Sequence, residues 1–191
     1  MTAELHITGD AEADSLLSTD PLALLIGMLL DQQVAMETAF AGPAKIKTRL
    51  GSFDAATIAH DSSEQMSAVF RTPPAVHRYP DSMAARTQAL CAAIIENWGG
   101  DAEAIWTRDD PDGAEVLRRL KALPGFGDQK AKIFLALLGK QRGVTAAGWE
   151  QASAPYSEKG SHRSVADIVD AESLTKVREF KKAAKAAAKK K

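Results

Sequence analysis

Residues 113–139 read GAEVLRRLKALPGFGDQKAKIFLALLG, and this stretch decides the fold. Apolar residues recur with helical spacing on both sides of the five-residue segment 123–127, Leu-Pro-Gly-Phe-Gly. The pattern predicts two helices joined by a hairpin turn. The two glycines permit backbone conformations and close approaches that side chains prevent, while Phe126 can fill the apolar seam between the helices.

The same hairpin predicts a phosphate site. The first amide groups of a helix have no partner within it and lie at the positive end of its dipole, so they can bind an anion. Lys130 and Lys132 follow the turn and can add charge there. The alternative is an ordinary helix pair whose glycines only tighten a turn. We expect DNA contacts from Leu123, Gly125, Phe126, Gly127, Lys130 and Lys132.

The rest of the chain indicates an all-α protein. Of the 191 residues, 45% are hydrophobic but only 6% aromatic, which favours helices over a sandwich or barrel. Asp20-Pro21 predicts the start of a core helix that reaches about Gln33, and its apolar run is too short to cross a membrane. Further helices are expected at 36–49, 54–59, 63–70, 82–97 and 101–107, and a last helix after Asp170. The segments 71–80 and 143–164 are expected to be loops.

Charge and cysteine content narrow the possible functions. Residues 176–191 contain eight Lys or Arg against Glu179, so this tail carries +7 and the remainder −8. A body this acidic has no general attraction for nucleic acid, and DNA contact must be local. The tail is either a solvated helix end or a DNA-binding arm. The single cysteine, Cys91, excludes an iron–sulfur cluster and a structural zinc site.

Three segments together resemble the HhH-GPD superfamily of base-excision DNA glycosylases, which includes endonuclease III and 3-methyladenine glycosylase II. They are the core helix with its following glutamines (20–33), the start of the next core helix (82–86) and the hairpin (123–131). The resemblance covers about residues 20–140. It implies two helical lobes flanking a cleft: a core of residues 20–140 with the helix-hairpin-helix at 113–139, and a second lobe of residues 1–19 plus 141–191.

The resemblance also implies partners and site residues. We expect a monomer whose partner is double-stranded DNA. No signal segment directs the chain to a membrane or out of the cell, so the expected location is the cytoplasm, in association with the nucleoid. Gln33, or Gln32 as the less favoured candidate, would fill the gap left by a flipped nucleotide. The alternative for Gln33 is a polar residue at a helix end that bonds to neighbouring backbone. A monovalent cation would bind the carbonyl groups of Lys121, Leu123 and Phe126. A flipped base needs a pocket, for which the loops offer Trp149, Tyr156, Tyr79 and His77.

Two departures from the family pattern concern catalysis. Gln129 occupies the position of the lysine that forms a Schiff base in bifunctional members. Lys130 is one residue later and about 100° around the helix, so we expect it to point at phosphate or solvent and predict no lyase activity. The family's catalytic aspartate lies about eighteen residues after the position of Gln129, and in this chain that position holds Ala147, which has no carboxylate. Asp167 is therefore the expected catalytic carboxylate, with Glu150 as the alternative.

These features predict a monofunctional DNA glycosylase that removes a damaged or non-standard base. The alternative is a catalytically silent protein that recognises DNA or damage through the same hairpin. A third interpretation, permitted by the acidic body, is a scaffold that no longer binds DNA.

Overall fold

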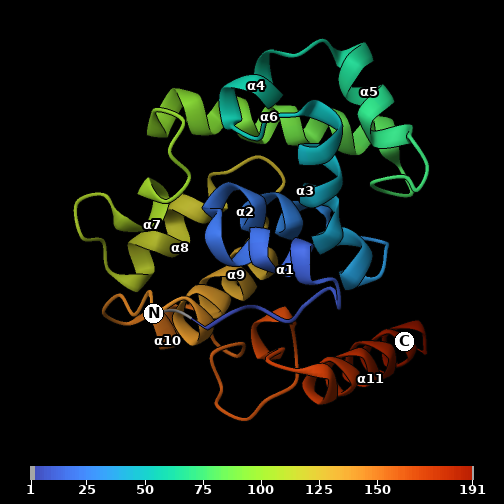
Figure 1. Cartoon of the computed structure of the whole chain (residues 1–191). Helices are drawn as coiled ribbons and strands as arrows, with labels where there is room; N and C mark the ends of the chain where they lie inside the picture. The colour runs from blue at the N-terminus through green and yellow to red at the C-terminus, as the bar shows by residue number, and fades with distance from the viewer. Residues whose placement is uncertain (1–2, 191) are drawn as a thin grey trace.

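A computed structural model describes residues 3–190, and within that range every regular element is helical (Figure 1). The elements in chain order are α1 (Ala11–Thr19), α2 (Pro21–Leu30), α3 (Met36–Leu50), α4 (Ala55–His60), α5 (Ser63–Arg71), α6 (Pro80–Trp98), α7 (Ala104–Thr107), α8 (Gly113–Lys121), α9 (Asp128–Gln141), α10 (Trp149–Ala152), the 3-10 helix η1 (Val165–Asp167) and α11 (Ala171–Lys189). The predicted all-α class is confirmed. Met1, Thr2 and Lys191, which belong to the predicted second lobe and tail, lie outside the described residues.

Helix α2 lies at the centre of the molecule (Figure 1). Every residue after Pro21 is buried, as expected for a helix that is apolar around its whole circumference. The Asp20 carboxylate accepts hydrogen bonds from the amides of Leu22 (2.9 Å) and Ala23 (3.2 Å), so the predicted cap is confirmed. The prediction that this helix reaches Gln33 is wrong. It ends at Leu30, because the chain turns through residues 31–35.

Helices α2 and α3 approach closely at two points, where a glycine of one helix receives a side chain of the other. A Cβ atom on Gly27 would lie 2.5 Å from the Phe40 ring, and one on Gly42 would lie 2.5 Å from Cδ1 of Leu30. Both separations are shorter than real Cβ contacts, so a larger residue at either position would force Phe40 or Leu30 to shift. The start of α3, and the turn that precedes it, are thereby fixed against the end of α2.

Helices α4, α5 and α6 form a layer above α2 and α3 in the view of Figure 1. The helices predicted at 36–49, 54–59, 63–70 and 82–97 are confirmed to within two residues at each end. Ser62 caps α5 by accepting from the Gln65 amide at 3.0 Å. The helix expected at 101–107 is shorter, because the Asp101 carboxylate holds the amide of Glu103 in a preceding turn.

The segments before and after residues 20–140 meet at the end of α9. The Arg142 guanidinium donates to the carbonyl of Ala3 at 2.8 Å and to that of Ser18, which ties the N-terminal segment to α9. The loop 143–164 contains the short helix α10, and α11 starts at the predicted cap, where the Asp170 carboxylate accepts from the Ser173 amide at 2.7 Å. The division into two lobes stays a prediction, because one continuous apolar cluster extends through the helices. Within residues 3–190, no individual helix combines the length and the apolar character needed to cross a bilayer.

Candidate nucleic-acid interface

The turn between α8 and α9 is buried on one side and exposed on the other. Leu123 and Phe126 are 5% and 3% exposed, whereas Pro124, Gly125 and Gly127 are exposed. The Phe126 amide donates to the Leu123 carbonyl at 3.1 Å, and its ring meets that of a phenylalanine in α9 edge-on at 6.2 Å between centroids. The predicted hairpin, with Phe126 in the seam, is confirmed. Its exposed side is the part that can meet another molecule.

The two glycines of the turn serve different purposes. Gly125 has a φ of 83°, and a Cβ atom there would lie 2.5 Å from Cδ1 of Leu29 in α2. Gly127 has an ordinary φ of −73°, and a Cβ atom there would meet nothing within 4 Å. Gly125 is therefore required by the fold itself. Gly127 leaves open space in front of the helix that begins after it.

The N-terminal end of α9 is open. Gly127 occupies the N-cap position, where no side chain caps the helix, and the first amide bonded inside the helix is that of Ala131, to the Gly127 carbonyl at 3.0 Å. The amides of residues 128–130 thus lie at the positive end of the helix dipole. A phosphate oxygen is a suitable acceptor for these groups.

Asp128 places a carboxylate beside these amides. It forms ion pairs with Lys121 and Lys132, each at 3.0 Å, and the hydrogen bonds from these lysines lower the pKa of Asp128. Lys132, predicted to bind phosphate, is thus paired with Asp128. Its contact with DNA stays a prediction, and it requires phosphate to compete with Asp128.

Lys130 does not point at phosphate or solvent, so that expectation is wrong. Its ammonium group donates to the carbonyls of Met28 (2.8 Å) and Leu29 (3.0 Å) and approaches that of Asp31 at 3.5 Å. It therefore caps the C-terminal end of α2, where a positive charge is favourable. Burial lowers its pKa to about 8. The physical reason is that the first turn of α9 lies within reach of the end of α2, whose last carbonyls need donors.

The turn at residues 31–35 separates Gln32 from Gln33. The Gln32 side chain is fully engaged: its Nε2 donates to the Leu29 carbonyl at 2.9 Å and its Oε1 accepts from Arg86 at 3.0 Å. Gln33 is exposed and has a φ of 58°, in the left-handed region that residues other than glycine rarely adopt. Strained backbone of this kind concentrates at functional sites. The geometry therefore leaves the side chain of Gln33, and not that of Gln32, available to another molecule.

His77 holds this turn in place. It is 2% exposed, and its Nδ1 accepts from the Tyr79 amide at 3.0 Å, so Nε2 carries the proton and donates to the Gln32 carbonyl at 2.9 Å. Burial lowers the pKa of His77, which favours this neutral form. His77 is thus a positioning residue for the turn, not a wall of a base pocket.

The other aromatic candidates also separate. Tyr79 is 43% exposed, with Arg78 above its ring. Trp149 packs on α9, where a Cβ atom on Gly139 would lie 2.3 Å from its ring. Tyr156 lines a groove beside α11. The structure therefore does not assemble the four predicted residues into one pocket.

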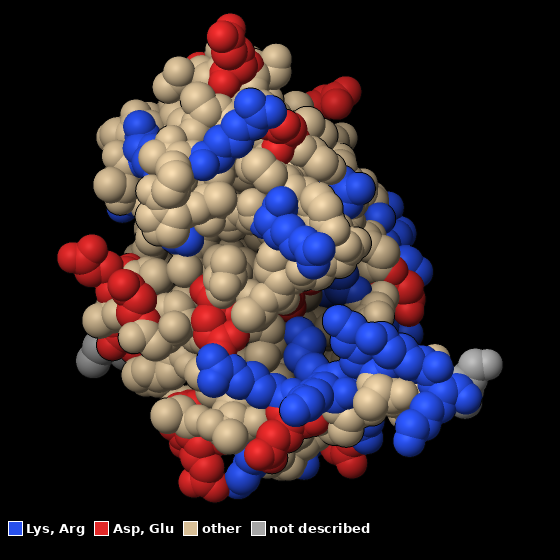
Figure 2. Space-filling model, turned by 90° about the vertical axis from the view of Figure 1, so that its right-hand side faces the viewer, with Lys and Arg blue, Asp and Glu red and all other residues tan. Residues whose placement is uncertain are grey.

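A groove of about 810 Å³ lies between the hairpin, the turn at 31–35 and α11. The residues that line it are Asp31, Gln32, Gln33, Val34, Ala35, Met36, Glu37, Gln129, Ile133, Tyr156, Arg163, Ser164, Val165, Arg178, Phe180, Lys181, Lys182, Ala184 and Lys185. Figure 2 shows a hollowed face of the molecule on which Lys and Arg side chains gather across the lower half and extend toward the C-terminal end. The hairpin helix and the basic tail thus border one groove.

Two carboxylates of the groove pair with α11. Lys181 lies 3.4 Å from Asp31, and Arg178 is paired with Glu37. The side chains of Asp31 and Glu37 are only 9% and 15% exposed, whereas those of Arg178 and Lys181 are 56% and 43% exposed. The acidic groups therefore form the floor of the groove and the cations cover them.

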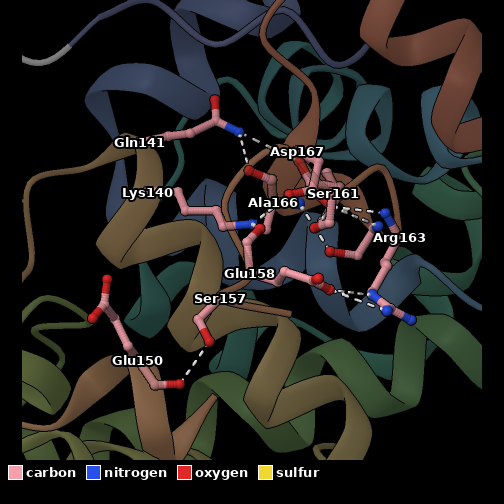
Figure 3. Close-up of polar contacts among 11 residues, drawn as sticks. Lys140, Gln141, Glu150, Ser157, Glu158, Ser161, Arg163, Ala166 and Asp167 are labelled. Atoms are coloured by element: carbon pink, nitrogen blue, oxygen red, sulfur yellow. Dashed lines mark hydrogen bonds and ion pairs between the residues drawn. The ribbon is translucent and has the colours of Figure 1, made fainter. Parts of the chain in front are cut away.

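Asp167 lies elsewhere (Figure 3). Its carboxylate is 3% exposed, 2.5 Å from the Lys140 ammonium, and it also accepts from the Arg163 amide at 2.8 Å and the Ser161 hydroxyl at 3.1 Å. It faces a second, smaller hollow on the other side of η1, not the groove. Glu150 is exposed, and its carboxylate points away from this network.

The sequence did not reveal the charged pairs of the groove. Asp31 stands directly before Gln32 and Gln33, but a helix expected to reach residue 33 gave its side chain no special role. Arg178 and Lys181 are three residues apart and so share a helix face, but nothing in the sequence indicates that this face meets residues about 140 positions earlier.

No known family model matches the chain, and a comparison with curated proteins finds no significant match. Membership of the HhH-GPD superfamily stays a prediction. Among residues 3–190, no three His, Cys, Asp or Glu side chains are grouped to hold a metal ion. Cys91 is buried, and burial raises the pKa of its thiol to about 12.

Proposed function

We propose that this protein binds duplex DNA through the hairpin and acts as a monofunctional DNA glycosylase on a damaged or non-standard base. One observation carries the proposal. The open N-terminal end of α9 borders the groove that also contains Gln33 and the carboxylate of Asp31. A phosphate anchor, a residue available for insertion and an anion beside a groove large enough for a base are thereby contiguous.

The hairpin supplies the phosphate anchor. Its amides bind a phosphate oxygen without net positive charge, and the open space at Gly127 admits the DNA backbone. A monovalent cation on the carbonyls of Lys121, Leu123 and Phe126 would add positive charge under the phosphate. The Leu123 carbonyl accepts one hydrogen bond and keeps a second lone pair for such an ion.

Asp31 is the carboxylate that we assign to the reaction, in place of Asp167. Breaking the bond between the base and C1′ of the sugar builds positive charge on the sugar, and a fixed anion stabilises that charge or accepts a proton from the attacking water. Asp31 lies at the C-terminal end of α2, where a carboxylate meets the negative end of the helix dipole. Such a local conflict is expected at functional sites.

The test is base release from duplexes that contain uracil, hypoxanthine, an alkylated purine or an oxidised base. Asp31→Asn should abolish release, because Asn keeps the shape but not the charge, while duplex binding persists, because the Arg178–Glu37 pair still holds α11 beside the groove. Glu150→Gln is the matched control and should behave as the wild type. Release that survives in Asp31→Asn contradicts the assignment of Asp31. Absence of salt-sensitive duplex binding contradicts the function as a whole.

A specific observation favours a second candidate, a silent DNA-recognition protein. Both groove carboxylates are paired with cations of α11, and both predicted catalytic carboxylates lie outside the groove. Tight binding of the same duplexes with no release from any of them would favour this candidate.

A further inference from the structure

The basic residues of α11 fall into two groups. One turn of a helix takes 3.6 residues, so Arg178, Lys181, Lys182 and Lys185 lie within an arc of about 100° on one face. All four line the groove. Arg178 and Lys181 are paired with the carboxylates of the floor, whereas among residues 3–190 Lys182 and Lys185 form no ion pair.

The distal half of α11 is held by charge and not by an apolar face. Its proximal half is anchored by Val177, which is fully buried, but every residue from 178 to 190 is exposed. Exposed ion pairs contribute only about 0–1 kcal/mol each. The alanine-rich sequence after residue 182 favours a helix by itself. The helix therefore needs no packing to form, and the two ion pairs, with Arg163 over the Phe180 ring, orient it beside the groove. The unpaired lysines carry charge that the fold does not use.

The net charge of the groove favours a polyanion. Five cationic side chains line it, those of Arg163, Arg178, Lys181, Lys182 and Lys185, against the two largely shielded carboxylates of Asp31 and Glu37. The rest of the body is acidic, so this is a local positive surface on a protein with a net charge of −1. It borders the same groove as the open amides of α9.

We propose that α11 is a second binding surface for the DNA backbone, on which Lys182 and Lys185 contact phosphates while Arg178 and Lys181 hold the helix beside the groove. The inference rests on the proposed function and extends it. The hairpin binds the DNA backbone through neutral amide groups, and α11 binds it through positively charged side chains. The two contacts differ in salt dependence, since only the lysines neutralise phosphates and release counterions.

The experiment measures binding of an undamaged duplex by fluorescence anisotropy between about 50 and 200 mM salt. The double variant Lys182→Gln plus Lys185→Gln keeps side-chain length and helix propensity. The slope of log affinity against log salt concentration should become shallower by about 2, at 0.9 per lost phosphate contact. The matched control, Lys159→Gln plus Lys176→Gln, removes the same charge beside the other hollow. It should keep the slope of the wild type.

The outcomes are distinguishable. If the wild type shows no salt-sensitive duplex binding, both the proposed function and this inference fail. If it binds, and the groove variant keeps its slope or the control loses as much, only the inference fails. If the groove variant keeps the duplex affinity and salt slope of the wild type but loses binding to vesicles containing phosphatidylserine, the surface serves an anionic membrane and the inference is overturned. Circular dichroism of both variants should match the wild type.

Discussion

The two ends of α9 differ in where their polar groups go. At the C-terminal end, Lys140 and Gln141 both donate to the η1 segment, and Arg142 donates to the N-terminal segment. Every one of these contacts joins α9 to a part of the same chain. At the N-terminal end, the helix has no side-chain cap and its first amides lie beside the groove.

The charged groups at the C-terminal end of α9 stabilise the fold, whereas the amides at its N-terminal end remain available to a ligand. A buried ion pair such as Lys140–Asp167, with further donors on the carboxylate, is fully satisfied and has no capacity for a substrate. An open helix end beside a groove retains that capacity.

The largest expected effect is at the C-terminal end of α9, which we call the closed end because its polar groups are bonded within the chain. Asp167→Asn removes the partner of Lys140, whose side chain is 15% exposed, and leaves a largely buried positive charge. We expect a loss of about 3 kcal/mol in the free energy of unfolding, measured by urea denaturation. The duplex affinity of the folded protein should not change, because the pair faces away from the groove. Replacing both members, Lys140→Met with Asp167→Leu, should restore much of the loss. If Asp167 had a catalytic role and no structural one, the substitution would leave stability unchanged.

Most of the fold was predictable because its signals are local. Asp20, Ser62 and Asp170 are side chains that cap amides two or three residues later, and the glycines of the hairpin act within five residues. The end of α2 was not predictable, because a lysine a hundred residues later closes its last carbonyls. Local sequence cannot show such a donor.

The site was predictable to a lesser degree. Residues 123–127 indicated the hairpin, and Gln33 was among the candidates for insertion. Asp167 and Lys130 were assigned from position along the chain, but their roles depend on partners that folding brings together: Lys140 for the first and the end of α2 for the second. The structure of the open, N-terminal end of α9 can thus be predicted from neighbouring residues. The contacts of the closed, C-terminal end cannot, because their partners are distant in the sequence.

The next effect compares the two glycines of the open end. Gly125→Ala should cost about 2 kcal/mol of stability, because alanine is strained at a positive φ and its Cβ atom would overlap Leu29. Gly127→Ala should cost at most about 1 kcal/mol, because its Cβ atom meets open space and only the poorer N-cap preference of alanine is lost.

Duplex affinity separates the roles of these glycines. Gly127→Ala should weaken binding about tenfold, which corresponds to about 1.4 kcal/mol, since the methyl group occupies the space that a phosphate would enter. Thermal unfolding and anisotropy on the same samples measure both quantities. Full affinity in Gly127→Ala would show that the backbone of the DNA does not approach this end.

Lys130 gives the open end a pH dependence. Burial lowers its pKa to about 8 in the folded protein from 10.5. Between these values the unfolded chain binds the proton and the folded protein releases it, so stability rises with pH across this window. We expect the stability of the wild type relative to Lys130→Met to increase by about 1 kcal/mol per pH unit. Because both proteins contain Cys91 and the other lysines, the titration of these groups cancels in the difference between the two stabilities. Urea denaturation of both proteins at two pH values within the window measures this difference. A difference that stays flat with pH would show that the ammonium is not desolvated, and one that falls would show that its charged form is stabilised by folding.

The smallest effect concerns Asp128, which places negative charge where the hairpin would receive a phosphate. Asp128→Asn should change stability by less than about 1 kcal/mol, since it removes exposed ion pairs and one favourable interaction with the helix dipole. Duplex affinity should rise about threefold, or about 0.7 kcal/mol, because Lys121 and Lys132 are freed and the repulsion is removed. The lysines hold the pKa of Asp128 below its ordinary 3.8, so this gain should persist across the neutral pH range.

Glu172→Gln is the matched control for Asp128→Asn, because it frees Lys176 in the same way beside the other hollow. Its duplex affinity should equal that of the wild type. An equal gain in both variants would reflect overall charge, and no gain in either would mean that phosphate does not reach the first turn of α9. Only a gain confined to Asp128→Asn places the DNA at the open end, because the two variants add the same charge and differ only in where they add it.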